Sequence, residues 1–115
     1  MGVGHVVLPT TNLNAACAFW TAVGMRPVER NENVAILELR GGTHLILTQP
    51  DASVTDESIP FDLMVDGIEA SCVQWDNCGL GPSPIQQGRN HQFFIVRDPD
   101  GRELVVHSSH VVGVV

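Results

Sequence analysis

Histidines and carboxylates are the side chains of this chain that could do chemistry, and several of them fall on short segments that alternate like β-strands. Imidazoles can bind metals or move protons, and carboxylates can attract cations or act as general bases. Side chains two residues apart on a strand share a face. By this rule, one face of the expected strands collects the following residues: His5, His44, Asp62, Glu103 and His107. We expect this face to bind a ligand, with Glu103 and Asp62 as candidate catalytic bases.

The opposite face of the same strands is almost wholly apolar. It carries Val6, Leu8, Leu45, Leu47, Phe61, Leu63, Val65, Leu104 and Val106. An apolar face of this kind is expected to pack under helices, whereas a mixed face is typical of a ligand cavity. Two further histidines, His91 and His110, lie outside the set, and we expect both to be ordinary surface residues.

Charge and composition exclude several classes of function. The chain has a formal net charge of −7, with six arginines and no lysine. Nucleic acids and anionic membranes are therefore poor partners, because both need clustered cations. A P-loop lysine and Schiff-base chemistry are ruled out by the missing lysine. No apolar run approaches the length of a membrane span and no signal peptide is visible, so we expect a cytoplasmic protein.

The sequence contains a tandem repeat. The segment from Leu13 to Trp20 recurs 55 residues later, from Ile68 to Trp75. Five identities keep this offset: Ala15 and Ala70, Cys17 and Cys72, Trp20 and Trp75, Gly24 and Gly79, and Pro27 and Pro82. The repeat predicts two modules of the same fold, at about residues 1–50 and 59–110, within one domain of 115 residues.

Each copy is expected to form a β-α-β-β-β unit. The expected strands are Val3–Leu8, Val34–Leu39, Thr43–Thr48, Phe61–Val65, Phe93–Arg97 and Glu103–His107. A helix runs from Leu13 to about Val23, and its counterpart begins near Ile68 with Asp66 as the expected cap. Trp20 and Trp75 lie on helical apolar stripes and are expected in the core.

Other polar candidates have plainer interpretations. Arg40 and Arg102 adjoin turns, and we expect solvated charges at both positions. Cys17, Cys72 and Cys78 fall in helix-like apolar patterns and are expected to be buried, reduced thiols.

Three stretches of sequence carry a family resemblance: the strand Gly4–Leu8, the helix text Phe19–Met25 and the turn Asp98-Pro99-Asp100-Gly101. With them, the duplicated β-α-β-β-β unit resembles the vicinal-oxygen-chelate superfamily, which includes glyoxalases, bleomycin-resistance proteins and ring-cleaving dioxygenases. The resemblance implies an α+β fold in which two tandem βαβββ modules form curved mixed sheets around a cavity. Because two short modules leave that cavity half open, we also expect a homodimer.

In metal-using members of this superfamily, the ligands come from the first and last strands of each module. His5 occupies one of these four places, but the others hold Ile46, Pro60 and Val105. Three interpretations of the histidines remain open. A displaced divalent-metal site could use His5 with His44 or His107 and a carboxylate, or the histidines could serve a metal-free cavity as polar anchors, or they could have no shared task.

Two functions follow from these alternatives. The first is a binding protein, similar to the bleomycin-resistance members, that holds a small cationic or aromatic molecule in the inter-module cavity without the usual metal centre. The second is a metal-dependent lyase, isomerase or dioxygenase with a displaced site. The residues favour the first, because three of the four usual ligand places lack donor atoms.

Overall fold

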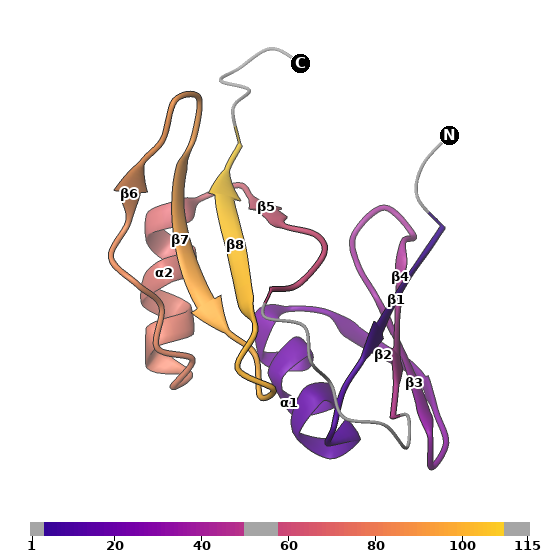
Figure 1. The fold of residues 1–115 in the computed structure, drawn as a ribbon. Coiled ribbons are helices and arrows are strands. Elements are labelled where there is room, and N and C mark those ends of the chain that lie inside the picture. Colours follow the sequence, from indigo (N-terminus) through magenta and orange to yellow (C-terminus); the bar gives the residue numbers. More distant parts are fainter. Residues whose placement is uncertain (1–3, 50–57, 110–115) are drawn as a thin grey trace. The chain divides into compact units, whose positions relative to one another are not determined.

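Two compact units make up the chain, residues 1–56 and residues 57–115 (Figure 1). The computed structural model describes residues 4–49 and 58–109. The first unit contains β1 (His5–Pro9), α1 (Leu13–Val23), β2 (Arg26–Arg30), β3 (Val34–Glu38) and β4 (His44–Thr48). The second contains β5 (Leu63–Val65), α2 (Ile68–Asn77), β6 (Gln86–Gln87), β7 (Gln92–Arg97) and β8 (Glu103–Ser108). Each unit therefore has the βαβββ order that the repeat predicts, and the α+β class is confirmed.

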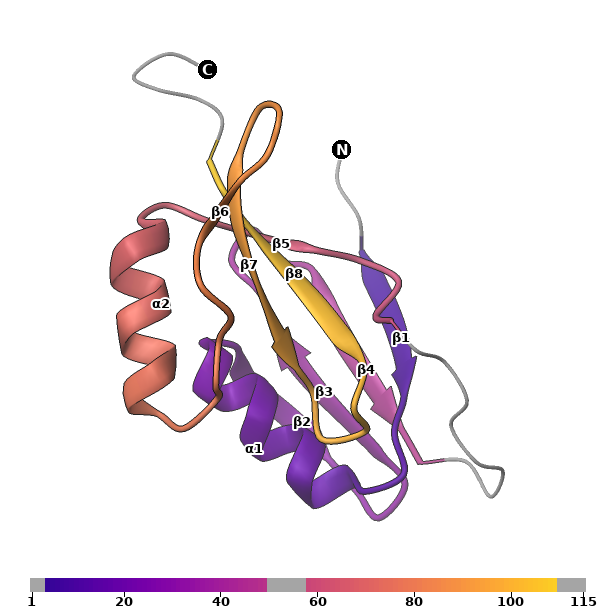
Figure 2. The same ribbon diagram turned by 60° about the vertical axis from the view of Figure 1, so that its left-hand side comes forward.

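The two sheets have the same topology. The strand order is β1-β4-β3-β2 in the first unit and β5-β8-β7-β6 in the second. In both sheets the first strand runs parallel to the last, while the other neighbours are antiparallel. Figure 2 shows the long β7–β8 hairpin that dominates the second sheet, in orange and yellow.

Strand register confirms the repeat at the level of single residues. Leu8 pairs with Leu47 in the first unit, and the equivalent pair in the second unit is Leu63 with Val106. The 55-residue offset of the first strands therefore holds for these residues. It does not hold at the start of the strand: His44 pairs with His5, whereas its counterpart Glu103 forms its bridge with Ser58 and not with Pro60. On the last strands, Val105 is the counterpart of Ile46.

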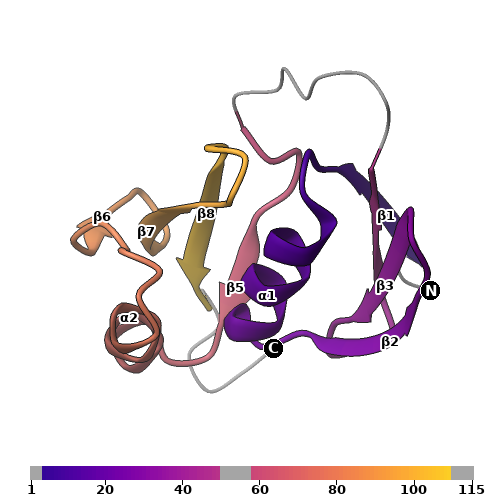
Figure 3. The same cartoon turned by 90° about the horizontal axis from the view of Figure 1, so that it is seen from below.

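The helices cover the apolar face of their own sheets. In the first unit α1 contacts β2, β3 and β4, and in the second α2 contacts β7 and β8, as the end-on view of α2 in Figure 3 illustrates. Trp20 and Trp75 are both buried, as predicted, with 0% and 3% of their surface exposed. Between helix and sheet lie the leucines of β4 and the alternate residues of β7 and β8, of which Phe94 is fully buried. The opposite face of each sheet is called the open face below.

The helix starts differ between the units. Asn12 caps α1, because its Oδ1 accepts a hydrogen bond of 3.0 Å from the amide of Ala15. The prediction that Asp66 caps α2 is wrong: Gly67 occupies the cap position, and it has no side chain that could form a capping hydrogen bond. Gly24 ends α1 with a φ of 120°, a conformation that suits glycine.

Two further expectations need correction or completion. The cysteines are free, but Cys78 is exposed and Cys17 and Cys72 are only half buried. The sequence pattern did not locate the strand that follows the helix in each βαβββ unit. This strand is β2 in the first unit and the very short β6 in the second. Within the described residues, no helix has the length and apolar character needed to cross a bilayer.

Candidate functional site

A row of four charged or titratable side chains crosses the open face of the first unit. Cross-strand pairing sets Arg26 beside Glu38, Glu38 beside His44, and His44 beside His5. Each of the four strands contributes one member of this row. Its position follows from strand alternation, since the neighbouring residues Leu37 and Leu45 face the helix and are buried.

Contacts link the row from one strand to the next. The guanidinium of Arg26 forms an ion pair with Oε2 of Glu38. Oε1 of Glu38 lies 3.5 Å from Nε2 of His44, and the His44 and His5 rings are 5.7 Å apart between centroids. The hydrogen bond and positive charge of Arg26 lower the pKa of Glu38, and His44 adds to this effect. Glu38 therefore remains a carboxylate well below neutral pH.

The open face of the second unit holds a different cluster around His107. Nε2 of His107 lies 3.1 Å from Oδ2 of Asp62, which directly precedes β5. The ring of His107 also neighbours Phe93, its cross-strand partner, and His91, at centroid distances of 6.3 Å and 5.1 Å. Because a carboxylate accepts hydrogen bonds, this contact favours the tautomer with the proton on Nε2. The other nitrogen, Nδ1, is buried and has no hydrogen-bond partner among the described residues.

A shallow hollow of about 550 Å³ lies next to this cluster. Its apolar part consists of Ile59, Pro60, Phe61 and Val105, and its polar part of Ser58, Asp62 and Glu103. Glu103 forms an ion pair of 2.9 Å with Arg97 across the β7–β8 hairpin. The hollow thus combines apolar side chains with two carboxylates. Asp62 lies beside His107, and Glu103 lies beside Arg97.

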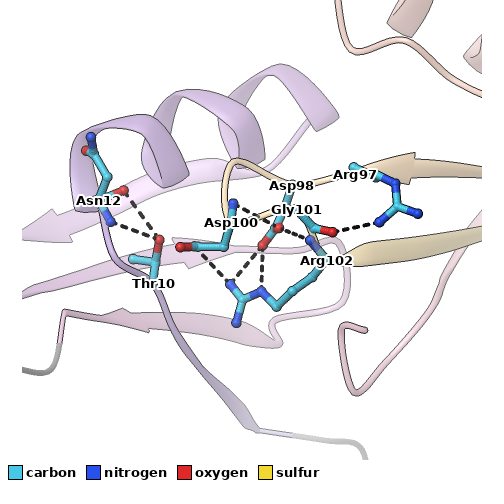
Figure 4. A network of polar contacts seen from close by, with 7 residues as sticks. All are labelled: Thr10, Asn12, Arg97, Asp98, Asp100, Gly101 and Arg102. Carbon is cyan, nitrogen blue, oxygen red and sulfur yellow. Dashed lines mark hydrogen bonds and ion pairs between the residues drawn. The ribbon is translucent and has the colours of Figure 1, made fainter. Parts of the chain in front are cut away.

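The turn between β7 and β8 is held by a buried ion pair (Figure 4). Nε and Nη2 of Arg102 lie 2.9 Å and 2.8 Å from Oδ2 of Asp98, and Nη2 also lies 3.3 Å from Oδ2 of Asp100. The expectation that Arg102 is a solvated turn charge is wrong, since only 1% of its surface is exposed. Arg102 instead holds the turn that leads into Glu103. The same figure draws a local contact at the start of α1, where Thr10 Oγ1 lies 3.4 Å from the amide of Asn12.

The predicted site residues form two groups. His5 and His44 are neighbours in the first unit, and Asp62 and His107 are hydrogen-bonded in the second, where Glu103 lines the hollow with Asp62. His91 was expected to be a surface residue, but its Nδ1 lies 2.8 Å from the Ser108 carbonyl and its ring packs near His107. His110 lies outside the described residues.

Sequence reasoning missed two members of the row in the first unit, Arg26 and Glu38. Glu38 could have been predicted from alternation, because it follows the apolar Leu37 near the end of a predicted strand and so points to the opposite face. Arg26 gave no signal, since β2 is an edge strand whose residues are all exposed and show no alternation.

The donor set does not fit the metal centre that the fold family implies. Register places Ile46 and Val105 at equivalent positions on the last strands. The 55-residue sequence offset sets Pro60 against His5. None of these three side chains can donate to a metal. Within residues 4–49 and 58–109, no three histidine, cysteine or acidic side chains are grouped closely enough to hold an ion. No catalytic step through such a centre follows from these residues.

The duplicated βαβββ units and their parallel first and last strands define a protein of the vicinal-oxygen-chelate class. A family model described as a glyoxalase-like domain matches residues 5–107. The chain therefore belongs to the glyoxalase-like domain family. No curated protein matches the sequence significantly.

Solved structures share the fold at low sequence identity. An integron cassette protein from the mobile metagenome of Vibrio cholerae is 23% identical, with 94% of each chain covered and a TM-score of 0.74. Lactoylglutathione lyase from Agrobacterium tumefaciens is 18% identical over 97% of this chain and 96% of its own, with a TM-score of 0.77. TnmS3, an antibiotic binding protein from Streptomyces sp. CB03234, is 17% identical over 94% and 95%, with a TM-score of 0.80.

Proposed function

We propose that the protein binds a small cationic or aromatic organic molecule on the open face of the second unit, without the four-ligand metal centre of its metal-using relatives. The observation that carries the proposal is the hollow of about 550 Å³, whose apolar floor is bordered by Asp62 and Glu103. A volume of this order suits a drug-sized ligand.

The chemistry of the hollow favours a cation with an aromatic or aliphatic body. Pro60, Phe61 and Val105 offer apolar surface, while the carboxylates of Asp62 and Glu103 supply negative charge. The net charge of −7 adds a long-range attraction for cations. Phe93 and His107 lie on the same open face and extend it with aromatic surface.

A binding role suits the carboxylates better than a catalytic one. Asp62 is hydrogen-bonded to His107, and Glu103 is ion-paired with Arg97. Both carboxylates therefore have a partner that orients them at the hollow. The similarity to an antibiotic binding protein supports the same class of function.

A charge-matched pair of probes tests this proposal. Benzyltrimethylammonium and neutral benzyl alcohol share an aromatic ring and differ in charge, and both can be titrated against the full chain in a thermal-shift assay. A ligand at about 100 times its dissociation constant stabilises the folded state by about 2.7 kcal/mol. We expect a shift of the melting temperature for the cation, and little or none for the alcohol.

Two variants test whether the cation raises the melting temperature by binding at the hollow on the open face. Asp62→Asn combined with Glu103→Gln should abolish the shift caused by the cation, because both charges at the hollow are removed. Asp76→Asn removes an exposed carboxylate from α2, on the other side of the sheet, and should leave that shift unchanged. Equal responses to both probes, or equal loss in both variants, would refute a charge-selective site.

We also propose that the protein is a homodimer. Large apolar side chains remain exposed on the open faces, with Val7 at 57% and Met64 at 52%. A second copy of the chain would shield such surface. Size-exclusion chromatography with light scattering should give twice the chain mass of 12.4 kDa, and a mass of one chain would contradict the proposal.

A further inference from the structure

We propose that the first unit binds a small monocarboxylate with an apolar body in a second hollow, between α1 and the strands β2 and β3. This helix-side hollow has a volume of about 350 Å³ and lies on the face of the sheet that α1 covers, opposite the open face. Small-molecule pockets measure about 300–1,000 Å³, so the volume suits a compact ligand. The inference goes beyond the proposed cation binding and does not depend on it, because the two hollows lie on different units.

A bulge in β2 brings an apolar ring and a guanidinium to the same hollow. Register pairs Pro27 with Leu37 and Arg30 with Ala35, and it shifts between Pro27 and Glu29. Leu37 and Ala35 are buried on the face that α1 covers. In a regular strand, residues three apart point to opposite faces, and one extra residue reverses this. The bulge therefore turns both Pro27 and Arg30 toward the helix side.

The body of the helix-side hollow is apolar because small side chains face each other across helix and sheet. Cys17 on α1 is only half buried, and Ala35 on β3 has the smallest side chain among the lining residues. The equivalent position in the second unit holds Phe94, since Ala35 pairs with Leu47 as Phe94 pairs with Val106. The uncharged residues that line the hollow are Cys17, Pro27, Val28, Ala35, Ile36 and Leu37. Such a lining suits an aromatic or aliphatic group.

Arg30 supplies the positive charge at this hollow. Its guanidinium donates a hydrogen bond to Oδ1 of Asn14 on α1, which holds it beside the helix. Arg26 and Arg97 each form an ion pair with a glutamate, whereas no carboxylate of the described residues lies within ion-pair distance of Arg30. A guanidinium has five donors and can bind a carboxylate through two of them. Arg30 therefore retains the donors that a bound carboxylate requires.

The remaining charges near the hollow do not cancel that of Arg30. Glu29 also borders the hollow, but it follows β3 residue Ile36 in register, and alternation places both on the face opposite Ala35. The helix α1 has no charged residue along its whole length. The helix side of the hollow is thus positive, which favours an anion over a cation or a neutral molecule.

Two-dimensional ¹H–¹⁵N NMR of the full chain tests the inference with phenylacetate and phenylethyl alcohol, which share a ring and a carbon skeleton and differ in charge. We expect saturable shifts centred on Cys17, Arg30 and Ala35 with phenylacetate. Because a charge-assisted pair with Arg30 is lost, the alcohol should bind at least about tenfold more weakly.

Variants assign the effect to Arg30 and to the space beside it. Arg30→Gln should weaken phenylacetate binding at least about tenfold and leave the affinity for the alcohol unchanged. Arg89→Gln removes an exposed arginine from the second unit, changes the net charge equally, and should bind phenylacetate as the unchanged chain does. Ala35→Leu extends a side chain into the hollow and should weaken the binding of both probes.

Circular dichroism of each variant verifies that it is folded, and the exposed position of Arg30 keeps the test valid if Ala35→Leu does not fold. Equal affinity for the two probes, undiminished phenylacetate binding by Arg30→Gln, or shifts centred on the second unit would overturn the inference. The organic cation of the second unit and the carboxylate of the first have opposite charges. Failure of either probe therefore leaves the other proposal standing.

Discussion

The two units share a fold but differ in what they place on equivalent positions. On the open face of the first, the register row holds Arg26, Glu38, His44 and His5. In the second unit, Arg97 and Glu103 occupy the places of Glu38 and His44. Ser58 forms the bridge to Glu103, as His5 pairs with His44 in the first unit. The two units thus share the strand order and most of the backbone pairing, while the side chains of the two faces have diverged. We infer that the two faces have separate tasks.

The hairpin turns of the two units also differ, because within the described residues only the β7–β8 turn contains a buried ion pair, between Arg102 and Asp98. Breaking this ion pair should have the largest effect on stability. Arg102→Ala leaves the buried carboxylate of Asp98 without its cation. Loss of one partner of a buried pair costs about 3–5 kcal/mol. Urea denaturation of Arg102→Ala should show a decrease of this size in the free energy of unfolding.

Arg40 is the matched control for that change. It adjoins the equivalent turn of the first unit but is exposed. Exposed charged side chains and their ion pairs usually contribute about 1 kcal/mol or less. Similar losses for Arg40→Ala and Arg102→Ala would contradict the difference between the two turns.

Substitutions at the two helix starts should change the free energy of unfolding by less than Arg102→Ala does. Asn12→Ala removes the side-chain cap of α1 and should cost about 1 kcal/mol. Gly67→Ser supplies a cap that α2 lacks and should gain a few tenths of a kcal/mol, because glycine is only slightly worse than serine there. The nearest atom to an added Cβ at Gly67 is 3.8 Å away, so the new side chain has room. Thermal unfolding of both variants checks the signs, and a destabilised Gly67→Ser would contradict the assignment of the cap.

The smallest predicted effect concerns the pH dependence contributed by Glu38. Since folding lowers its pKa, chiefly through Arg26, ionised Glu38 stabilises the folded state above the ordinary carboxyl value of 4.5. This contribution is lost as the pH falls through the lowered value. The melting temperature of the unchanged chain should therefore exceed that of Glu38→Gln at pH 7, and the difference should shrink toward pH 3. A constant difference at all pH values would refute the ion pair with Arg26.

The sequence predicted most of the fold because the repeat could be aligned to itself. Alternation identified the buried faces of β1, β4 and β8, and helical spacing placed Trp20 and Trp75 in the core. Edge strands were harder, since β2 is exposed along its whole length and β6 has two residues. Neither can show the alternation that burial imposes on a central strand.

The candidate site was only partly predictable, because its groupings depend on register. Alternation indicated that His5, His44, Asp62, Glu103 and His107 belong to open faces, but not which of them are neighbours. His91 was misjudged, because a histidine just before a strand gives no sign that its ring packs against β8. Arg102 was misjudged because the carboxylates that bury it, Asp98 and Asp100, lie in the same turn and resemble a solvated surface pattern.

The central claim is that the second unit binds an organic cation at the hollow beside Asp62 and Glu103. Two-dimensional ¹H–¹⁵N NMR of the full chain during titration with benzyltrimethylammonium tests it most directly. We predict saturable shifts centred on Phe61, Asp62, Glu103 and Val105, the residues that line the hollow. Shifts confined to the first unit, or no saturable shifts at all, would contradict this assignment.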